Sequence, residues 1–96
     1  MLHSTANVTT DRPGRYAAQL VRHLGHRSET RWEEPAGYIK FQNGGRCDLL
    51  AEAAALRLDA YADTEEALTR VEHIVKGHLE RFAVQDPLTV NWERPA

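Results

Sequence analysis

The chain has 96 residues, of which 42% are hydrophobic and 27% are charged, and this composition is ordinary for one globular domain spanning residues 1–96. Its 12 basic and 14 acidic side chains are scattered, so no basic run is available to neutralise phosphates and nucleic-acid binding is not expected. No apolar stretch is long enough to cross a membrane, the first residues lack a secretory pattern, and the one cysteine cannot form an intrachain disulfide. We therefore expect a cytoplasmic protein that contacts no membrane.

The first elements follow from two different periods. In "STANVTT" (residues 4–10) apolar and polar residues alternate, which predicts a half-buried strand with Ala6 and Val8 on one face. The next segment changes to helical spacing and predicts a helix from about Arg12 to Leu24. Asp11 is a suitable N-cap for this helix, and Gly25 is a suitable C-terminal cap.

Two further segments predict strands in the middle of the chain. "ETRWE" (29–33) predicts a short strand around Trp32 that ends at Pro35. "GYIKFQNGGRCDLLAE" (37–52) predicts a hairpin, because two alternating runs flank Asn-Gly-Gly. A three-residue loop over 43–45, with Gly45 left-handed, gives cross-strand pairs of matching character, namely Phe41–Cys47, Ile39–Leu49, Lys40–Asp48 and Tyr38–Leu50.

The last third of the chain predicts a strand, a helix and a closing strand. "AAALRLDAYA" (53–62) alternates, although the turn before it lacks glycine. The segment 62–83 predicts a second helix that begins at Asp63 or Thr64. "PLTVNW" (87–92) predicts a final strand with Leu88, Val90 and Trp92 on one face.

The predicted element order is β-α-β-β-β-β-α-β. Each helix has one apolar stripe and each strand has one apolar face, so the sequence predicts an α+β two-layer sandwich with both helices on one face of a mostly antiparallel sheet. This order resembles the TATA-binding-protein-like topology, and an elaborated ferredoxin-like arrangement is the alternative. The order of the strands within the sheet does not follow from the sequence.

Two histidines are the candidate metal ligands. In "VEHIVKGHLERF" (71–82), His78 lies at the edge of the buried stripe that Val75 and Leu79 help to form. His23 lies at the edge of the stripe of the first helix. If the helices lie side by side, the two rings can face each other and bind iron or zinc, or organise an enzyme site. The alternative is that each ring is partly buried and bonded to a backbone carbonyl or a carboxylate.

Catalytic signals are scarce. The chain contains no Gly-x-Ser-x-Gly, no Gly-x-Gly-x-x-Gly, no phosphate loop and no His-Glu-x-x-His. Alternation directs Cys47 into the core, where it acts as a small hydrophobic residue rather than a nucleophile. We therefore assign no catalytic residue and no cofactor, and the sequence favours a non-catalytic role without excluding an enzyme.

The outer face of the sheet is the candidate binding surface. Its charges alternate in sign, as on an ordinary solvated face, but Tyr38, Leu50 and Tyr61 interrupt them. If these three side chains cluster, an apolar patch with a rim of Lys40, Arg57 and Asp59 would suit a partner or a second copy of the chain. Scattered exposure of the three side chains is the alternative.

Three segments carry a resemblance to a known family. "RPGRYAAQLVRHL" (12–24), "HLERFA" (78–83) and "LTVNW" (88–92) resemble a family of small bacterial proteins catalogued as domain of unknown function DUF 2218. The resemblance implies no reaction, cofactor or catalytic residue. It implies at most a link to siderophore and iron handling, with a flavin-dependent siderophore-interacting reductase as a partner. Together these features predict an accessory or binding module that forms a homodimer, with a metal-binding protein or enzyme built on His23 and His78 as the alternative.

Overall fold

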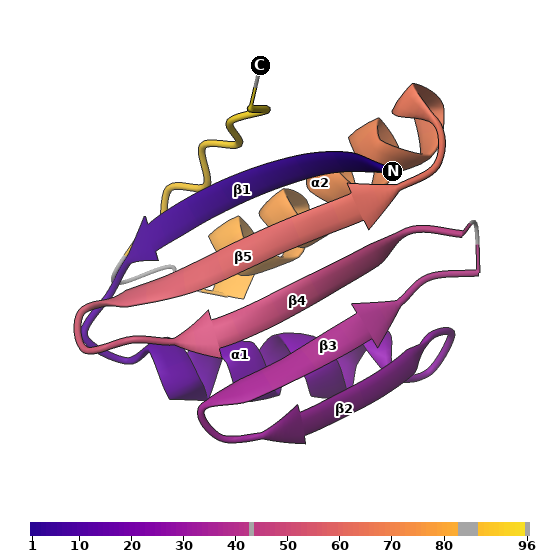
Figure 1. The fold of residues 1–96 in the computed structure, drawn as a ribbon. Coiled ribbons are helices and arrows are strands. Elements are labelled where there is room, and N and C mark those ends of the chain that lie inside the picture. Colours follow the sequence, from indigo (N-terminus) through magenta and orange to yellow (C-terminus); the bar gives the residue numbers. More distant parts are fainter. Residues whose placement is uncertain (43, 83–86, 96) are drawn as a thin grey trace.

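A five-strand sheet and two helices make up the fold (Figure 1). The computed structural model describes residues 1–42, 44–82 and 87–95. Both helices lie behind the same face of the sheet, and the opposite face carries no helix (Figure 1). In chain order the elements are β1 (Leu2–Thr9), α1 (Pro13–Leu24), β2 (Glu29–Glu33), β3 (Ala36–Lys40), β4 (Arg46–Ala51), β5 (Ala55–Ala62) and α2 (Glu65–Phe82).

The strand order in the sheet is β1-β5-β4-β3-β2, and all four strand pairs are antiparallel. The chain therefore begins at one edge, passes behind the sheet through α1 to the opposite edge, and returns strand by strand until β5 pairs with β1. This arrangement confirms the predicted α+β two-layer sandwich and its TATA-binding-protein-like topology. The ferredoxin-like alternative is wrong, because its β-α-β units need a parallel pair of strands and the described strands form none.

One hydrophobic core fills the space between the sheet and the helices. Every second residue of the central strands points into it, and its largest fully buried side chains include Leu20, Ile39, Leu49, Leu58 and Leu79. The two helices begin differently. Thr64 Oγ1 accepts a hydrogen bond from Ala67 N at 3.1 Å and caps α2, whereas no side chain caps α1. The predicted cap Asp11 is therefore wrong, and the Thr64 alternative at the second helix is confirmed.

The β3–β4 hairpin has a different register from the predicted one. Ile39 lies opposite Cys47, and Lys40 lies opposite Arg46. Phe41 N donates to Gly45 O at 2.7 Å, so the loop covers residues 42–44, of which Asn43 lies outside the described residues. The glycine with positive φ is Gly44, at 92°, rather than Gly45.

The register error is a shift of two residues, and its cause is physical. A shift of two leaves every side chain on its predicted face, so the alternating pattern cannot detect it. Lys40 and Asp48 do not pair with each other, as the sequence predicted, and each instead has another partner. Arg46 bonds Asp48 two residues along the same strand, at 2.6 Å, and Lys40 lies 3.5 Å from Glu29 on β2. Each cation has its own carboxylate, so the juxtaposition of Lys40 and Arg46 is tolerated.

The C-terminal segment 87–95 is not the regular strand that the sequence predicts. Its one bridge to the sheet joins Glu93 to Thr5 of β1. The segment is held against α2 instead, because Trp92 Nε1 donates to Glu72 O at 3.1 Å and Glu80 Oε2 accepts from Val90 N at 3.1 Å. Val90 is fully buried, as the alternation of apolar residues predicted. The regular strand pairing that the same alternation predicted is not present in this segment.

We expect Val90→Ala to lower the free energy of unfolding by about 2 kcal/mol, because it removes buried methyl groups and leaves a cavity. Thr89→Ala is the matched control in the same segment. Thr89 is exposed, so its effect should stay within about 0.5 kcal/mol. Urea unfolding followed by tryptophan fluorescence measures both. Equal effects of the two substitutions would show that the segment does not contribute to the core.

Candidate functional site

The outward side chains of the five strands form a surface that we call the open face. Neither α1 nor α2 covers it (Figure 1). The strand register places on it four residues from each of the two longest strands and three from each of the others, namely His3, Thr5, Asn7 and Thr9 of β1, Ala55, Arg57, Asp59 and Tyr61 of β5, Arg46, Asp48 and Leu50 of β4, Ala36, Tyr38 and Lys40 of β3, and Glu29, Arg31 and Glu33 of β2.

All six residues predicted for the binding surface lie on the open face, but their apolar members do not form one patch. Tyr38 lies beneath two cations, since the guanidinium carbon of Arg46 is 4.7 Å and Lys40 Nζ is 5.3 Å from its ring centroid. Tyr61 instead stacks on His3, with ring centroids 4.6 Å apart. Leu50 is 39% exposed. Charged side chains separate the three, so the open face is a mosaic rather than a hydrophobic surface.

Asp59 is the centre of the charge network on β5. His3 Nε2 donates to Asp59 Oδ1 at 2.9 Å, and Arg57 Nε donates to Asp59 Oδ2 at 3.1 Å. Partial burial by itself would raise the pKa of Asp59, but the hydrogen bonds from His3 and Arg57 and the positive charge of Arg57 outweigh it and lower the pKa. Asp48 lies directly opposite Asp59, and its own partner Arg46 compensates this like-charge pair.

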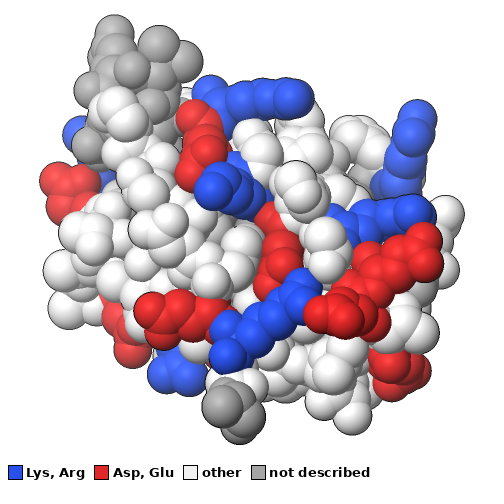
Figure 2. All heavy atoms as spheres, turned by 90° about the horizontal axis from the view of Figure 1, so that it is seen from above, with Lys and Arg blue, Asp and Glu red and all other residues white. Residues whose placement is uncertain are grey.

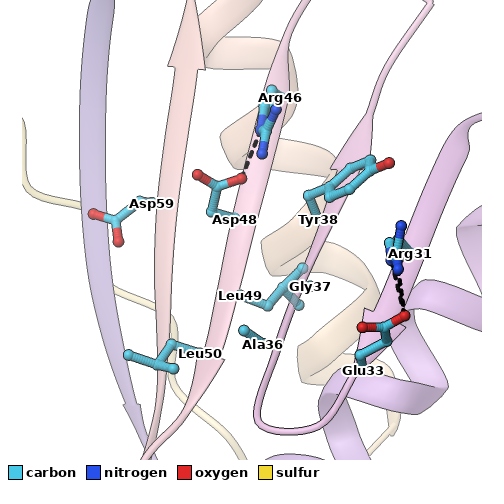
Figure 3. A pocket seen from close by; sticks show the side chains of 10 residues that line it. All are labelled: Arg31, Glu33, Ala36, Gly37, Tyr38, Arg46, Asp48, Leu49, Leu50 and Asp59. Atoms are coloured by element: carbon cyan, nitrogen blue, oxygen red, sulfur yellow. Dashed lines mark hydrogen bonds and ion pairs between the residues drawn. The ribbon is translucent and has the colours of Figure 1, made fainter.

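A depression of about 460 Å³, here called the sheet hollow, lies between β2 and β5 on the open face (Figure 3). The small residues Ala36 and Gly37 leave the space that larger neighbours surround. Figure 3 shows two ion pairs at this surface, Arg46 with Asp48 and Arg31 with Glu33. The complete lining is Arg31, Glu33, Ala36, Gly37, Tyr38, Arg46, Asp48, Leu49, Leu50 and Asp59.

Three of the six predicted residues line the sheet hollow, namely Tyr38, Leu50 and Asp59, while Lys40, Arg57 and Tyr61 lie on the open face beside it. The sequence reasoning missed the contribution of β2. Its signal was present, because Arg31 and Glu33 flank the inward Trp32 and must therefore point outward. The sequence did not show that β2 lies beside β3, and the position of Arg31 and Glu33 on the open face depends on that pairing.

The charged side chains that line the sheet hollow all have ion-pair partners. Arg31 pairs with Glu33 and Arg46 pairs with Asp48 within the lining, whereas Asp59 pairs with Arg57 beside it. The described lining contains no serine, threonine, cysteine, histidine or lysine. The thiol of Cys47 points away into the core, where burial, followed by the nearby charges of Asp48 and Asp59, raises its pKa above the ordinary value. The interpretation of Cys47 as a core residue agrees with this position.

The two candidate histidines come together at the helix layer. The ring centroids of His23 and His78 are 5.1 Å apart in an edge-to-face arrangement, and Phe82 lies 5.7 Å from His23. His78 Nδ1 lies 2.7 Å from Ile74 O and donates a hydrogen bond to that carbonyl. The rings therefore meet, and His78 is half-buried and bonds a backbone carbonyl, whereas His23 is exposed. The described residues contain no group of three ligand side chains able to hold a metal ion.

The surface seen from above in Figure 2 carries Lys and Arg side chains interspersed with Asp and Glu, without an extended area of one sign. Within the described residues, no helix combines the length and the apolar character that crossing a membrane would require.

The fold and the open face define a two-layer α+β protein with one uncovered antiparallel sheet. The chain belongs to the family described as an uncharacterized protein conserved in bacteria (DUF2218), whose family model matches residues 5–93. The predicted family is therefore confirmed. The chain is also similar to the NMR structure of PA4090 from Pseudomonas aeruginosa, at 30% sequence identity and a TM-score of 0.80 over 97% of this chain and 96% of that chain. No curated protein matches the chain.

Asp59→Asn should flatten the acid side of the stability profile. Folding lowers the pKa of Asp59 from its ordinary value of 3.8. The ionised carboxylate therefore stabilises the folded protein at pH values above 3.8, and this stabilisation is lost as the pH falls through the lower pKa of the folded state. Urea unfolding measured from about pH 5 to pH 2.5 should therefore show a smaller loss of stability for the variant than for the parent.

Asp11→Asn is the control, since Asp11 is an exposed carboxylate outside the sheet and should keep the parental slope. Parallel profiles for the parent and Asp59→Asn would contradict the assignment of this network.

Proposed function

We propose that this protein is a small cytoplasmic accessory module without a catalytic centre, and that it self-associates through the open face. The observation that carries the proposal is the uncovered sheet with its hollow and the exposed Leu50. A sheet of five strands with one face bare presents a large, rigid surface, and such a surface is suited to a second layer supplied by another chain.

The charges of the open face favour a second copy as the occupant. They comprise four basic side chains and four acidic side chains, leaving His3 aside, so the face is neutral and two copies do not repel each other. A two-fold axis would also place each row of alternating charges opposite the same row of the second copy. The eight residues are Arg31, Lys40, Arg46, Arg57, Glu29, Glu33, Asp48 and Asp59.

The size of the open face limits the strength of the dimer. Five strands about 4.8 Å apart, with lengths of five to eight residues, cover on the order of 500 Å² in projection. A standard-size complex buries roughly 800 Å² on each partner. We therefore expect a weak dimer that dissociates at micromolar concentration rather than an obligate one.

Leu50→Lys should abolish the dimer, because it places an uncompensated cation in the interface. Leu2→Lys is a matched control. Both leucines are exposed, at 39% and 42%, but Leu2 lies at the end of β1 on the side that faces the helices. Sedimentation equilibrium over a concentration series should show self-association for the parent and the control and a monomer for Leu50→Lys. Tyr38→Ala should also weaken the dimer, because Tyr38 lies at the middle of β3 on the same face.

A strict monomer at every concentration would contradict self-association. We also propose the link to siderophore and iron handling that the family resemblance implies. In that case the open face would be the surface that contacts the reductase. If the parent chain is a monomer that binds a flavin-dependent siderophore-interacting reductase, and Leu50→Lys removes that binding, the occupant is the reductase rather than a second copy.

A metal-binding protein organised by His23 and His78 is the second candidate. The 5.1 Å distance between the ring centroids supports it, since two imidazoles that close can reach one ion with bonds of about 2 Å. The pair supplies two ligands, so the remaining positions would belong to water or to a small molecule.

Zinc or ferrous iron titration tests the metal candidate. His23→Ala and His78→Ala should each weaken uptake by about tenfold or more. His73→Ala is the matched control on α2, because His73 is exposed and takes no part in the ring contacts. Identical uptake by all four proteins would end this candidate.

A further inference from the structure

A second depression, here called the basic groove, lies at the helix layer and is separate from the open face. It has a volume of about 750 Å³ and is bounded by the end of α1, the turn after it, the beginning of the β3–β4 loop and the middle of α2. Its lining is His23, Leu24, His26, Arg27, Ser28, Phe41, Gln42, Arg70, Ile74 and His78. Three imidazoles and two guanidiniums thus surround one space, and none of the described residues that line it is acidic.

The arginines of the basic groove differ from those of the open face. Arg31, Arg46 and Arg57 each form an ion pair with a carboxylate on their own strand. Within the described part of the chain, no carboxylate lies within ion-pairing distance of Arg27 or Arg70. In a chain whose net charge is −2, two such guanidiniums at one depression form a local positive potential that a bound anion would neutralise.

Apolar side chains give the basic groove its second property. Leu24, Phe41 and Ile74 are half-buried and line the same space as the guanidiniums. A ligand that fits both must carry an anionic group for the arginines and an apolar part for these three side chains. Arginine suits carboxylate and phosphate because its planar fork can donate two parallel hydrogen bonds.

We propose that the basic groove is a binding site for a small organic anion that carries a carboxylate or phosphate group beside an apolar moiety. Arg27 and Arg70 bind the anionic group, and Phe41 with Ile74 contacts the apolar part. His23 and His78 form the wall between them, with His78 oriented by its hydrogen bond to Ile74 O. This site is independent of self-association, which uses the other side of the sheet.

Benzoate is a suitable first probe, with inorganic phosphate as the anionic group alone and benzyl alcohol as the neutral counterpart. In a titration followed by two-dimensional ¹H–¹⁵N NMR, benzoate should give saturable shifts confined to the amides around residues 23–28, 41–42 and 70–78. Phosphate should bind more weakly at the same residues. Benzyl alcohol should bind at least about fivefold more weakly than benzoate, because it lacks the charge that the guanidiniums recognise.

Arg27→Gln and Arg70→Gln should each weaken benzoate binding about fivefold or more, since each removes a charged hydrogen bond. Arg81→Gln is the matched control, because Arg81 is also exposed on α2 but does not line the basic groove. The spectrum of each variant reports whether it is folded. Equal binding of benzoate and benzyl alcohol would overturn the proposal, as would parental affinity in the Arg27→Gln/Arg70→Gln double variant or shifts that never saturate.

Discussion

Burial of one face of the sheet is the constraint on which the rest of the structure depends. Because Ile39, Leu49 and Leu58 must face the helices, the residues between them are committed to the open face whatever their chemistry. Eight charged side chains therefore share a bare surface, and they satisfy one another within and between neighbouring strands. The mosaic of ion pairs follows directly from covering only one side of the sheet, and so does the absence of a dry apolar patch.

Much of this architecture could be predicted from alternation and helical spacing, because those patterns record which side of an element is buried. They do not record register or pairing partners. The β3–β4 hairpin shows the limit, since moving the loop from 43–45 to 42–44 leaves each side chain on the same face. The C-terminal segment shows another limit. The buried Val90 could be predicted, but hydrogen bonds to α2 rather than strand pairing determine its path.

The sequence could predict those parts of the candidate sites that depend on the residue pattern of a single helix or strand. The contact of His23 with His78 was a prediction conditional on helix adjacency, and the structure supplies that adjacency. The remaining cations of the basic groove were not predictable. Arg27 comes from a turn and Arg70 from the exposed side of α2, so no periodic pattern in the sequence relates them. Segments far apart in the chain meet only once the sheet has fixed both helices.

The C-terminal segment has a consequence for how sheets of this protein could join edge to edge. Its backbone exchanges two hydrogen bonds with Thr5, so the outer rim of β1 is occupied partway along its length. Incoming strands from other molecules are excluded there, whereas the rim of β2 stays accessible and bears alternating charges that discourage amyloid-like growth. Because the β1 edge is blocked, sheets can join only through their β2 edges. Two molecules could pair in this way, but a third could not be added.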